Sequence, residues 1–346
     1  NPRPFKTLLD ERIETYFSQH KLRRQGNWRL YSKSIILLTS LFAVYACILS
    51  LTPGWYTLLL CALLGLIQST IGFNVMHDAA HDSYSDHTNL NRFLAWVGGD
   101  LMGGSTFHWR IKHNIIHHTY TNIEGMDDDI AKYPIFRLSP DQELKWFHRY
   151  QFLYALPLYF FTTFNWILFD DYFKLLTRKI NTMDIRPMKF REHFGFWSGK
   201  LINLTLFLVI PIFLFGFWKA LLGFFVMHAA LGLSLALVFQ MAHVVESADF
   251  PIPNDQDKIE NEWALHQLAT TVNFAMKNRV ISWLVGGLNF QVEHHLYPKI
   301  SHIHYPDISR IVRKTCEDFN VPYHAFPTFR KALSSHFRYL KLLGTV

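Results

Sequence analysis

Residues 32–76 read SKSIILLTSLFAVYACILSLTPGWYTLLLCALLGLIQSTIGFNVM, and this apolar stretch decides the fold class. One membrane-spanning helix needs roughly 20 apolar residues, so the stretch is long enough for two. It is interrupted by Thr52-Pro53-Gly54, which has the composition of a turn. A second apolar block, 200–242, is interrupted at 216–219 (GFWK). The sequence therefore predicts two hairpins of membrane-spanning helices, and buried helices of a soluble protein are the less favoured alternative.

The composition and the charge distribution agree with a membrane protein. Half of the 346 residues are hydrophobic and 16% are aromatic, more than a soluble domain of this length usually carries. Lys and Arg crowd the segments before, between and after the two blocks, so the positive-inside rule places both termini and the middle segment in the cytoplasm. The net charge of +7 suits a surface that meets anionic lipid headgroups or a ligand with phosphates. Alternatively, it only reflects the positive residues that set the membrane orientation.

The chain divides into five predicted regions. They are an N-terminal amphipathic cytoplasmic segment (1–31), transmembrane hairpin 1 (32–76), a cytoplasmic histidine-rich region (77–199), transmembrane hairpin 2 (200–242) and a cytoplasmic C-terminal region (243–346). The apolar stretch 151–169 is expected in the membrane interface or inside the cytoplasmic domain, because a third consecutive span would separate the histidine groups. The expected fold is an all-α integral membrane protein with four transmembrane helices, capped by a cytoplasmic helical domain.

Eight of the 19 histidines are grouped next to the predicted spans. They lie in HDAAH (His77, His81), HNIIHH (His113, His117, His118), MAHVVES (His243) and QVEHH (His294, His295). Histidines at i and i+4 share a helix face and can reach one metal ion. Adjacent histidines point about 100° apart on a helix, so each adjacent pair is expected to serve two centres. The spacing predicts a site for two metal ions, and imidazole alone does not choose between Zn, Cu, Fe and Ni.

A metal-binding histidine also needs an acceptor for its second ring N–H. Asp78 and Asp82 lie inside or beside HDAAH and are the favoured acceptors, with ordinary solvated charge as the alternative. Glu246, Glu293 and the acidic run 127–129 are also available. The three cysteines show no CxxC pattern, so neither a disulfide framework nor a thiolate metal site is expected.

These motifs resemble those of the membrane-bound fatty acid desaturases. HDAAH, HNIIHH and QVEHH match that family's three histidine boxes, and the resemblance covers the chain from about Leu30 to about Pro306. Gln291, which opens the third box, resembles the front-end branch of delta-6-like and linoleoyl-CoA desaturases. That branch places a double bond between an existing one and the carboxyl end. The resemblance implies that the eight histidines bind metal, that Gln291 does so directly or through water, and that no other residue is catalytic.

The resemblance also implies the cofactors and partners. Two Fe ions, with O2 as co-substrate, would remove two hydrogens from a fatty acyl-CoA or acyl-lipid chain. The electrons would come from a separate ferredoxin or cytochrome b5-type protein, since the chain has no HPGG haem motif. No nucleic-acid partner is expected. HNIIHH is one residue longer than the front-end form HxxHH, so the position of the double bond stays open. The candidate substrate-binding residues are Trp109, Asn273, Arg110 and Lys112.

Two other functions remain as alternatives. The same scaffold supports hydroxylation of an acyl chain, an alkane or a carotenoid, although the glutamine in the third box favours desaturation. A non-enzymatic membrane protein that binds metal is the more distant alternative. Transporters hold their ions near the bilayer midplane, whereas these histidines lie outside the predicted spans or at the end of one. A zinc protease is a weaker alternative still, because the chain has no HExxH motif.

Overall fold

The computed structural model describes residues 4–254, 259 and 262–345, so the predicted regions 1–31 and 243–346 include a few residues outside this description. The described chain is mostly helical. It forms two compact units. The first unit comprises Asn1–Gly26, Lys112–Leu153 and Val238–Val346, and the second comprises Asn27–Ile111 and Tyr154–Leu237.

Four helices of the described chain are long and apolar enough to cross a membrane: Trp28–Ser50, Trp55–Ala80, Phe190–Phe215 and Phe217–His243. The first is α2 and the last is α13. The second consists of α3 (Trp55–Ile71), the π-helix η1 (Gly72–Met76) and α4 (His77–Ala80), and the third of α11 (Phe190–Leu204), the π-helix η5 (Thr205–Val209) and α12 (Ile210–Phe215). The prediction of four apolar helices is confirmed.

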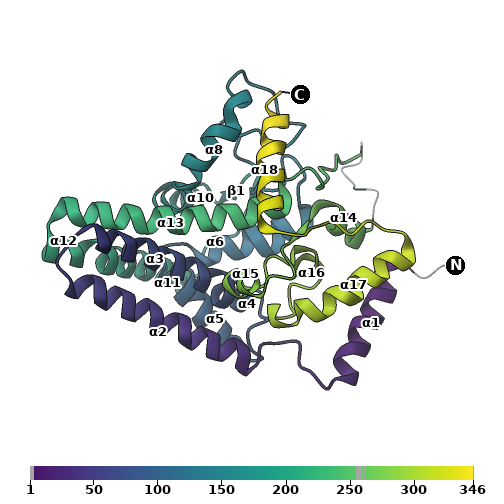
Figure 1. Ribbon diagram of the computed structural model, residues 1–346, viewed down its shortest axis with the longest axis horizontal. Helices are drawn as coiled ribbons and strands as arrows, with labels where there is room; N and C mark the ends of the chain where they lie inside the picture. Colours follow the sequence, from purple (N-terminus) through teal and green to yellow (C-terminus); the bar gives the residue numbers. More distant parts are fainter. Residues whose placement is uncertain (1–3, 255–258, 260–261, 346) are drawn as a thin grey trace. The chain divides into compact units, whose positions relative to one another are not determined.

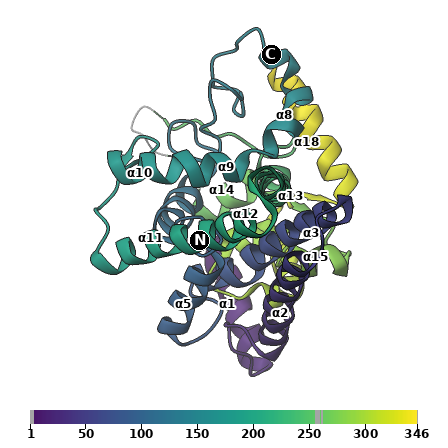
Figure 2. The same cartoon turned by 90° about the vertical axis from the view of Figure 1, so that its left-hand side faces the viewer.

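Close packing joins these helices within the second unit. Helices α2 and α3 lie side by side in both views (Figures 1 and 2). A Cβ atom on Gly65 of α3 would lie 2.1 Å from the carbonyl oxygen of Met227 on α13, so a glycine is required at this crossing. The Tyr45 hydroxyl on α2 donates to the Leu206 carbonyl in η5. Contacts through small residues are typical of helix pairs in membranes.

The remaining elements of the second unit are short. They are α5 (Thr88–Gly98), α6 (Thr106–Arg110), α9 (Thr162–Asn165), the π-helix η4 (Trp166–Asp170), α10 (Asp171–Thr177) and the antiparallel strands β1 (Lys179–Ile180) and β2 (Met183–Asp184). Helix α8 (Gln151–Tyr159) begins in the first unit and covers much of the predicted interfacial stretch. The chain bends by 73° between His148–Tyr159 and Thr162–Thr177, so this apolar stretch is a broken helix.

The first unit contains the other helices and a short parallel strand pair. Its elements are α1 (Phe5–Gln19), the π-helix η2 (Ile111–His117), α7 (His118–Tyr120), the 3-10 helices η3 (His148–Tyr150) and η6 (His302–His304), α14 (Trp263–Thr270), α15 (Arg279–Leu284), α16 (Gln291–Leu296), α17 (Tyr305–Phe319), α18 (Phe329–Leu343), and the strands β3 (Asn273–Phe274) and β4 (Ala325–Phe326).

The apolar core of the first unit holds α16 in place. Helix α1 buries one residue per turn in this core: Phe5, Leu9, Ile13 and Phe17. It lies beside α17 (Figure 1), where the rings of Phe5 and Phe319 are 5.5 Å apart. Val292 and Leu296, four residues apart on α16, face the same core. The opposite positions of α16 are therefore left for its polar residues.

Candidate metal centre

Three histidines from separate parts of the first unit converge. His117 ends η2, His243 ends α13 and His295 lies on α16. Their potential ligand nitrogens lie within 4.8 Å of one another. The ring centroid of His117 is 4.7 Å from that of His243 and 4.9 Å from that of His295. All three side chains are buried, so this histidine triad is shielded from bulk water.

Each ring of the triad has an acceptor at Nδ1. His117 Nδ1 lies 3.0 Å from Asp127 Oδ2, His243 Nδ1 lies 3.3 Å from the Thr270 carbonyl oxygen, and His295 Nδ1 lies 2.7 Å from Gln267 Oε1. An acceptor at Nδ1 holds the ring proton there and leaves the lone pair on Nε2. The triad therefore presents Nε2 lone pairs, as the ligands of one metal ion do.

The unsatisfied atoms of the triad fit a metal. The Nε2 atoms of His117 and His243 are buried and have no hydrogen-bond partner among the residues that the structure describes. A buried polar atom without a partner costs about 1–3 kcal/mol. A metal cation between the rings would satisfy both lone pairs, and imidazole is a common ligand of Fe and Zn.

Acidic side chains add negative charge next to the triad. Burial lowers the pKa of His117, but the carboxylates of Asp127 and Asp129 outweigh it and hold that pKa above its usual value. Burial raises the pKa of Asp129, but Lys112 and His117 outweigh it and hold that pKa well below its usual value. The Asp129 carboxylate is therefore ionised, and its charge favours a cation at the triad.

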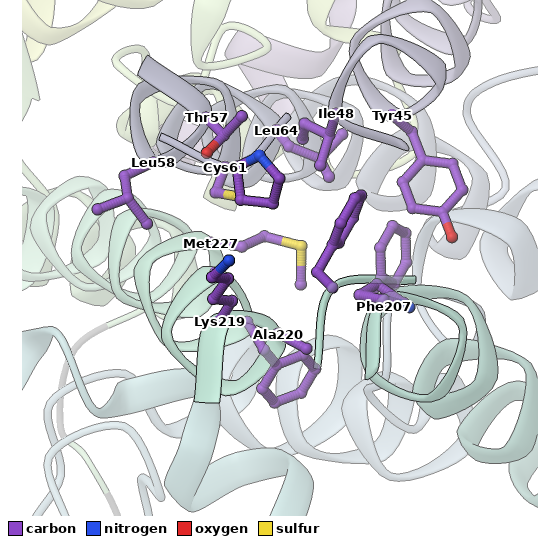
Figure 3. Close-up of a pocket in the computed structure, with 15 residues that line it drawn as sticks. Tyr45, Ile48, Thr57, Leu58, Cys61, Leu64, Phe207, Lys219, Ala220 and Met227 are labelled. Atoms are coloured by element: carbon purple, nitrogen blue, oxygen red, sulfur yellow. The ribbon is translucent and has the colours of Figure 1, made fainter. Parts of the chain in front are cut away.

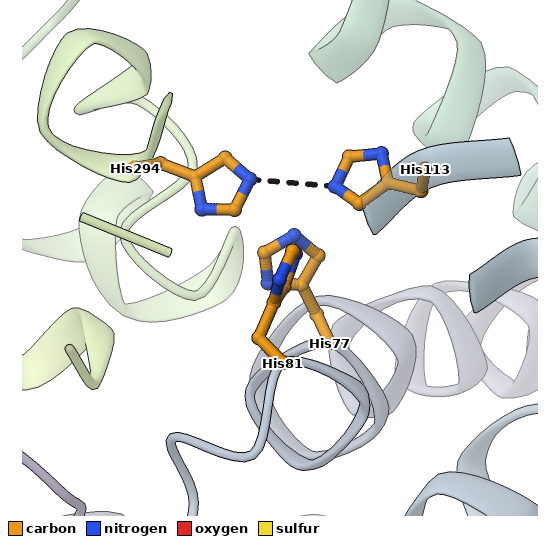
Figure 4. A group of neighbouring side chains, drawn as sticks. All are labelled: His77, His81, His113 and His294. Carbon is orange, nitrogen blue, oxygen red and sulfur yellow. Dashed lines mark hydrogen bonds between the residues drawn. The ribbon is translucent and has the colours of Figure 1, made fainter. Parts of the chain in front are cut away.

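A second group of histidines lies in the same unit. His113 Nε2 is 3.3 Å from His294 Nε2 (Figure 4) and 3.3 Å from His118 Nε2. Two imidazole nitrogens that face each other at this distance share a proton or a cation, because one of them must be an acceptor. His294 Nδ1 lies 3.2 Å from the Tyr305 hydroxyl, which orients its ring.

The adjacent histidines of QVEHH lie against different rings. The rings of His294 and His295 are inclined by 85°; His294 lies against His113, and His295 lies against His117. Both also lie beside His118, and one nitrogen from each of these three rings lies within 4.8 Å of the others. Gln291 lies four residues before His295, on the same face of α16. Its buried side chain lies beside the His243 ring. The spacing of QVEHH thus brings a glutamine and a histidine to one group and a second histidine to the other.

His77 and His81 form a pair in the second unit. They follow η1 on successive turns of one helix (Figure 4), and their ring centroids are 4.7 Å apart. The predicted substrate-binding residue Trp109 packs edge-on against both rings, at 5.6 Å and 5.9 Å. The carbonyl of Asp78 accepts from the amide of Ser83. The i, i+4 spacing therefore places both rings on one helix face.

Several predicted residues have partners outside the histidine groups. Asp82 forms an ion pair with Arg110 at 2.9 Å, and its side chain is 46% exposed. Lys112 pairs with Asp128 at 3.1 Å and with Asp129 at 2.7 Å. These contacts hold the segments that carry HDAAH and HNIIHH.

Asn273, a further predicted substrate-binding residue, contacts the first turn of α16. It donates to Glu293 at 2.9 Å and accepts from the Val292 amide at 2.9 Å. Tyr323 also donates to Glu293, at 2.8 Å. Burial raises the pKa of Glu293 to about 7. This network fixes the start of the helix that carries Gln291.

Several residues that hold the histidines carry no signal in the sequence. Gln267 accepts from His295 and donates to the His118 carbonyl at 3.2 Å. Asn122 adopts a left-handed backbone conformation, with φ of 59°, and donates to the His243 carbonyl at 3.0 Å. No spacing relates these residues to the histidine motifs, because tertiary folding brings them together.

Comparison with known proteins gives a consistent result. A model of the fatty acid desaturase family matches residues 53–327, which include all eight grouped histidines. The sn-1 linoleoyl-lipid 6-desaturase of Synechocystis sp. is 38% identical over 345 residues, which cover 99% of this chain and 96% of the relative. The protein of the same name from Arthrospira platensis is 36% identical, with 98% and 92% covered. The acyl-lipid (8-3)-desaturase of Physcomitrium patens is 35% identical, with 98% and 72% covered.

Proposed function

We propose, for a chain that belongs to the fatty acid desaturase family, that its grouped histidines bind two iron ions and that its substrate is a linoleoyl chain in a glycerolipid. The chain is a membrane-bound oxidoreductase that desaturates acyl chains, and its relatives place it in the front-end group. The relative from Synechocystis sp. is named for the sn-1 linoleoyl lipid and for position 6. The new double bond is therefore proposed at position 6.

The arrangement of the triad is the single observation that supports the metal site most strongly. Three buried rings each have an acceptor at Nδ1, and two of them have an Nε2 without a partner in the described chain. Buried polar atoms usually have a hydrogen-bond partner, so two such Nε2 atoms beside one shared space are a place for a cation. Rings fixed in one tautomer around a shared space are typical of metal ligands with outer-shell partners.

The proposed ligands fall into two sets. His117, His243 and His295 bind one ion, with Gln291 as a direct or water-mediated partner. His113, His118 and His294 bind the other, and His77 and His81 complete the ligands, as the family resemblance implies. The i, i+4 spacing of His77 and His81 supports their inclusion. Asp127, Thr270 and Gln267 orient the first set by accepting from its Nδ1 atoms.

The chemistry requires a strong oxidant, because the hydrogens to be removed lie on unactivated methylene groups and no base can take them. Iron held by these histidines would supply that oxidant from O2 and two external electrons. The residues of the chain hold the ligands, keep water from the site and position the acyl chain. Trp109, beside His77 and His81, is proposed to contact that acyl chain. The electron donor is proposed to be a separate ferredoxin or cytochrome b5-type protein.

The proposed topology has two hairpins of spans, with both termini and the histidines in the cytoplasm. The four apolar helices support it, as do the Lys and Arg residues outside them. Arg110 and Lys112 lie next to HNIIHH and would then face the cytoplasm, near the headgroup of a lipid substrate. Their ion pairs with acidic residues support a role in holding the histidine segments as well.

A lipid profile tests the proposed function. The chain and its His117→Ala variant are expressed in a host that is fed linoleate, and double bonds are located by mass spectrometry. We expect a new bond on the carboxyl side of the existing bonds with the unsubstituted chain, and none with His117→Ala. His336→Ala is the matched control, because His336 is buried but bonds to the Val244 carbonyl at 2.7 Å. A hydroxylated product, or equal activity of the two variants, would contradict the proposal.

A further inference from the structure

An apolar pocket lies among the spans of the second unit (Figure 3). Its walls include Cys61 and Leu64 from α3, Phe207 from η5, and Ala220 and Met227 from α13. It contains about 560 Å³ of empty space, part of which is open to the outside. Its predominantly apolar lining suits an apolar ligand.

The pocket lies far from His77 and His81, the grouped histidines of its own unit. Leu58, which lines it, precedes His77 by 19 residues on one nearly continuous helix. At 1.5 Å per residue this separation is about 28 Å, close to the roughly 30 Å thickness of the hydrocarbon core of a bilayer. The pocket and the pair His77–His81 therefore belong to opposite membrane surfaces. It is not part of the candidate metal centre.

Small side chains lie between α3 and α13 beside the pocket. The crossing at Gly65 and Met227 brings α3 and α13 together. Beyond this crossing Cys61, Ala220 and Gly223, none of which has a large side chain, line part of the pocket. A Cβ atom on Gly223 would lie 3.2 Å from Cys61 Sγ, so α3 and α13 also pack closely at this level. The pocket opens toward the surroundings of the spans, which in a bilayer are lipid acyl chains.

The mouth of the pocket carries a single cation. Lys219 lines it and is the only Lys, Arg, Asp or Glu in the two segments 34–76 and 201–242. Its side chain is exposed, and it has no ion pair or hydrogen bond to another residue in the part of the chain that the structure describes. A cation that no acidic side chain neutralises attracts an anion from outside the protein.

Exposed aromatic residues indicate the depth of this mouth. Trp55 begins α3 and is 75% exposed, and Trp218 at the start of α13 is 78% exposed. Tryptophan at the ends of membrane helices marks the level of the lipid headgroups. Lys219 follows Trp218 directly, so its ammonium lies at headgroup level, and the apolar walls lie beneath it in the hydrocarbon.

We propose that this pocket binds one acyl chain of an anionic phospholipid, whose phosphate pairs with Lys219. In a phospholipid the anionic phosphate lies nearer the membrane surface than the acyl chains do. Lys219 likewise lies nearer that surface than the apolar walls of the pocket. The proposed site holds a structural or regulatory lipid at the membrane surface opposite His77. It goes beyond the proposed function, and it depends only on the membrane location of the spans.

A photoactivatable lipid tests the site on the full chain. Phosphatidylglycerol with a diazirine near the end of one acyl chain is added to the purified protein in phosphatidylcholine nanodiscs, and adducts are mapped by mass spectrometry. We expect adducts at the walls of the pocket, and an excess of unlabelled phosphatidylglycerol should reduce them without affecting adducts on exposed residues. Lys219→Glu should reduce them about fivefold, as expected for one basic residue at an anionic headgroup, and Lys219→Arg should retain them.

Two neighbouring substitutions provide matched controls. Leu58→Trp fills the pocket and should abolish the adducts, whereas Leu59→Trp, at an outward position that is 61% exposed, should leave them unchanged. Three results would overturn the proposal: adducts spread evenly over exposed residues and insensitive to competition, equal labelling by a diazirine hydrocarbon without a headgroup, or unchanged labelling of Lys219→Glu. The competition experiment uses the unsubstituted protein, so it remains decisive even if a variant fails to fold.

Discussion

Replacement of Asp127 by asparagine tests how the proposed metal ligand His117 is held. Asp127 is fully buried, and its Oδ2 accepts from His117 Nδ1 and from the Asn122 amide at 2.9 Å. Its Oδ1 accepts from the Asp129 amide at 3.0 Å. Whichever way an asparagine carboxamide turns, its NH2 faces one of these backbone donors. The substitution therefore removes one hydrogen bond and the negative charge beside His117.

The size of the effect follows from that contact. An outer-shell partner of a metal-ligating histidine typically contributes about 10–100-fold in metal affinity, which corresponds to about 1.4–2.7 kcal/mol. The lost hydrogen bond to a buried amide adds about 1–3 kcal/mol of destabilisation. Asp127→Asn should therefore fold with a lower melting temperature and bind iron about 10–100-fold more weakly.

The assay is iron bound per chain across a series of Fe(II) concentrations, with double-bond formation measured in cells. Asp128→Asn is the matched control, because Asp128 pairs with Lys112, and Lys112 keeps a second partner in Asp129. Asp128→Asn should bind iron nearly as well as the unsubstituted chain. Unchanged iron affinity in Asp127→Asn, or an equal loss in Asp128→Asn, would refute the reasoning.

Three further predictions concern stability. Gly65→Ala places a Cβ atom 2.1 Å from the Met227 carbonyl oxygen and should lower the free energy of unfolding by about 1–3 kcal/mol. The Cβ atom of Gly72→Ala meets nothing within 4 Å, so this variant should not lower the melting temperature. Equal losses of stability in the two variants would contradict this. Ile13→Ala leaves a cavity at a buried core position and should lower the free energy of unfolding in denaturant by about 2–5 kcal/mol. A loss near zero would show that α1 does not pack against the core of the first unit. Burial raises the pKa of Asp100 to about 6, so the folded state keeps a proton that the unfolded chain loses, and stability falls between about pH 4 and pH 6. Asp100→Asn has no carboxyl group to titrate, so its melting temperature should rise relative to that of the unsubstituted chain between about pH 4 and pH 6. A difference in melting temperature that does not change with pH would contradict this prediction.

Hydropathy was sufficient to predict the apolar helices. A span is defined by its length and by the absence of charge, and both are local properties of the sequence. The breaks within the helices were not predicted. The π-helices η1 and η2 immediately precede or contain His77, His113 and His117, and a π-helical turn has no residue pattern that distinguishes it from an α-helical turn.

The histidine motifs also carried local information. The spacing of His117 and His118, and of His294 and His295, predicts that each adjacent pair serves two centres. This stays a prediction, because His294 and His295 also lie together with His118. The binding of metal by these histidines stays a prediction. The acceptors at Nδ1 could not be anticipated, since Gln267 and Thr270 lie on or at the end of α14, far from the histidine motifs in sequence. Only the fold brings them to His295 and His243.

The most direct test of the central claim follows a labelled linoleoyl chain in the host's lipids. Cells that express the protein receive isotope-labelled linoleate, and glycerolipids and acyl-CoA are sampled over time, with the double bonds located in each pool. We expect a new bond on the carboxyl side of the existing bonds to appear first in the glycerolipid, and not to appear with His117→Ala. Appearance first in acyl-CoA, a bond on the methyl side, or a product that persists with His117→Ala would contradict it.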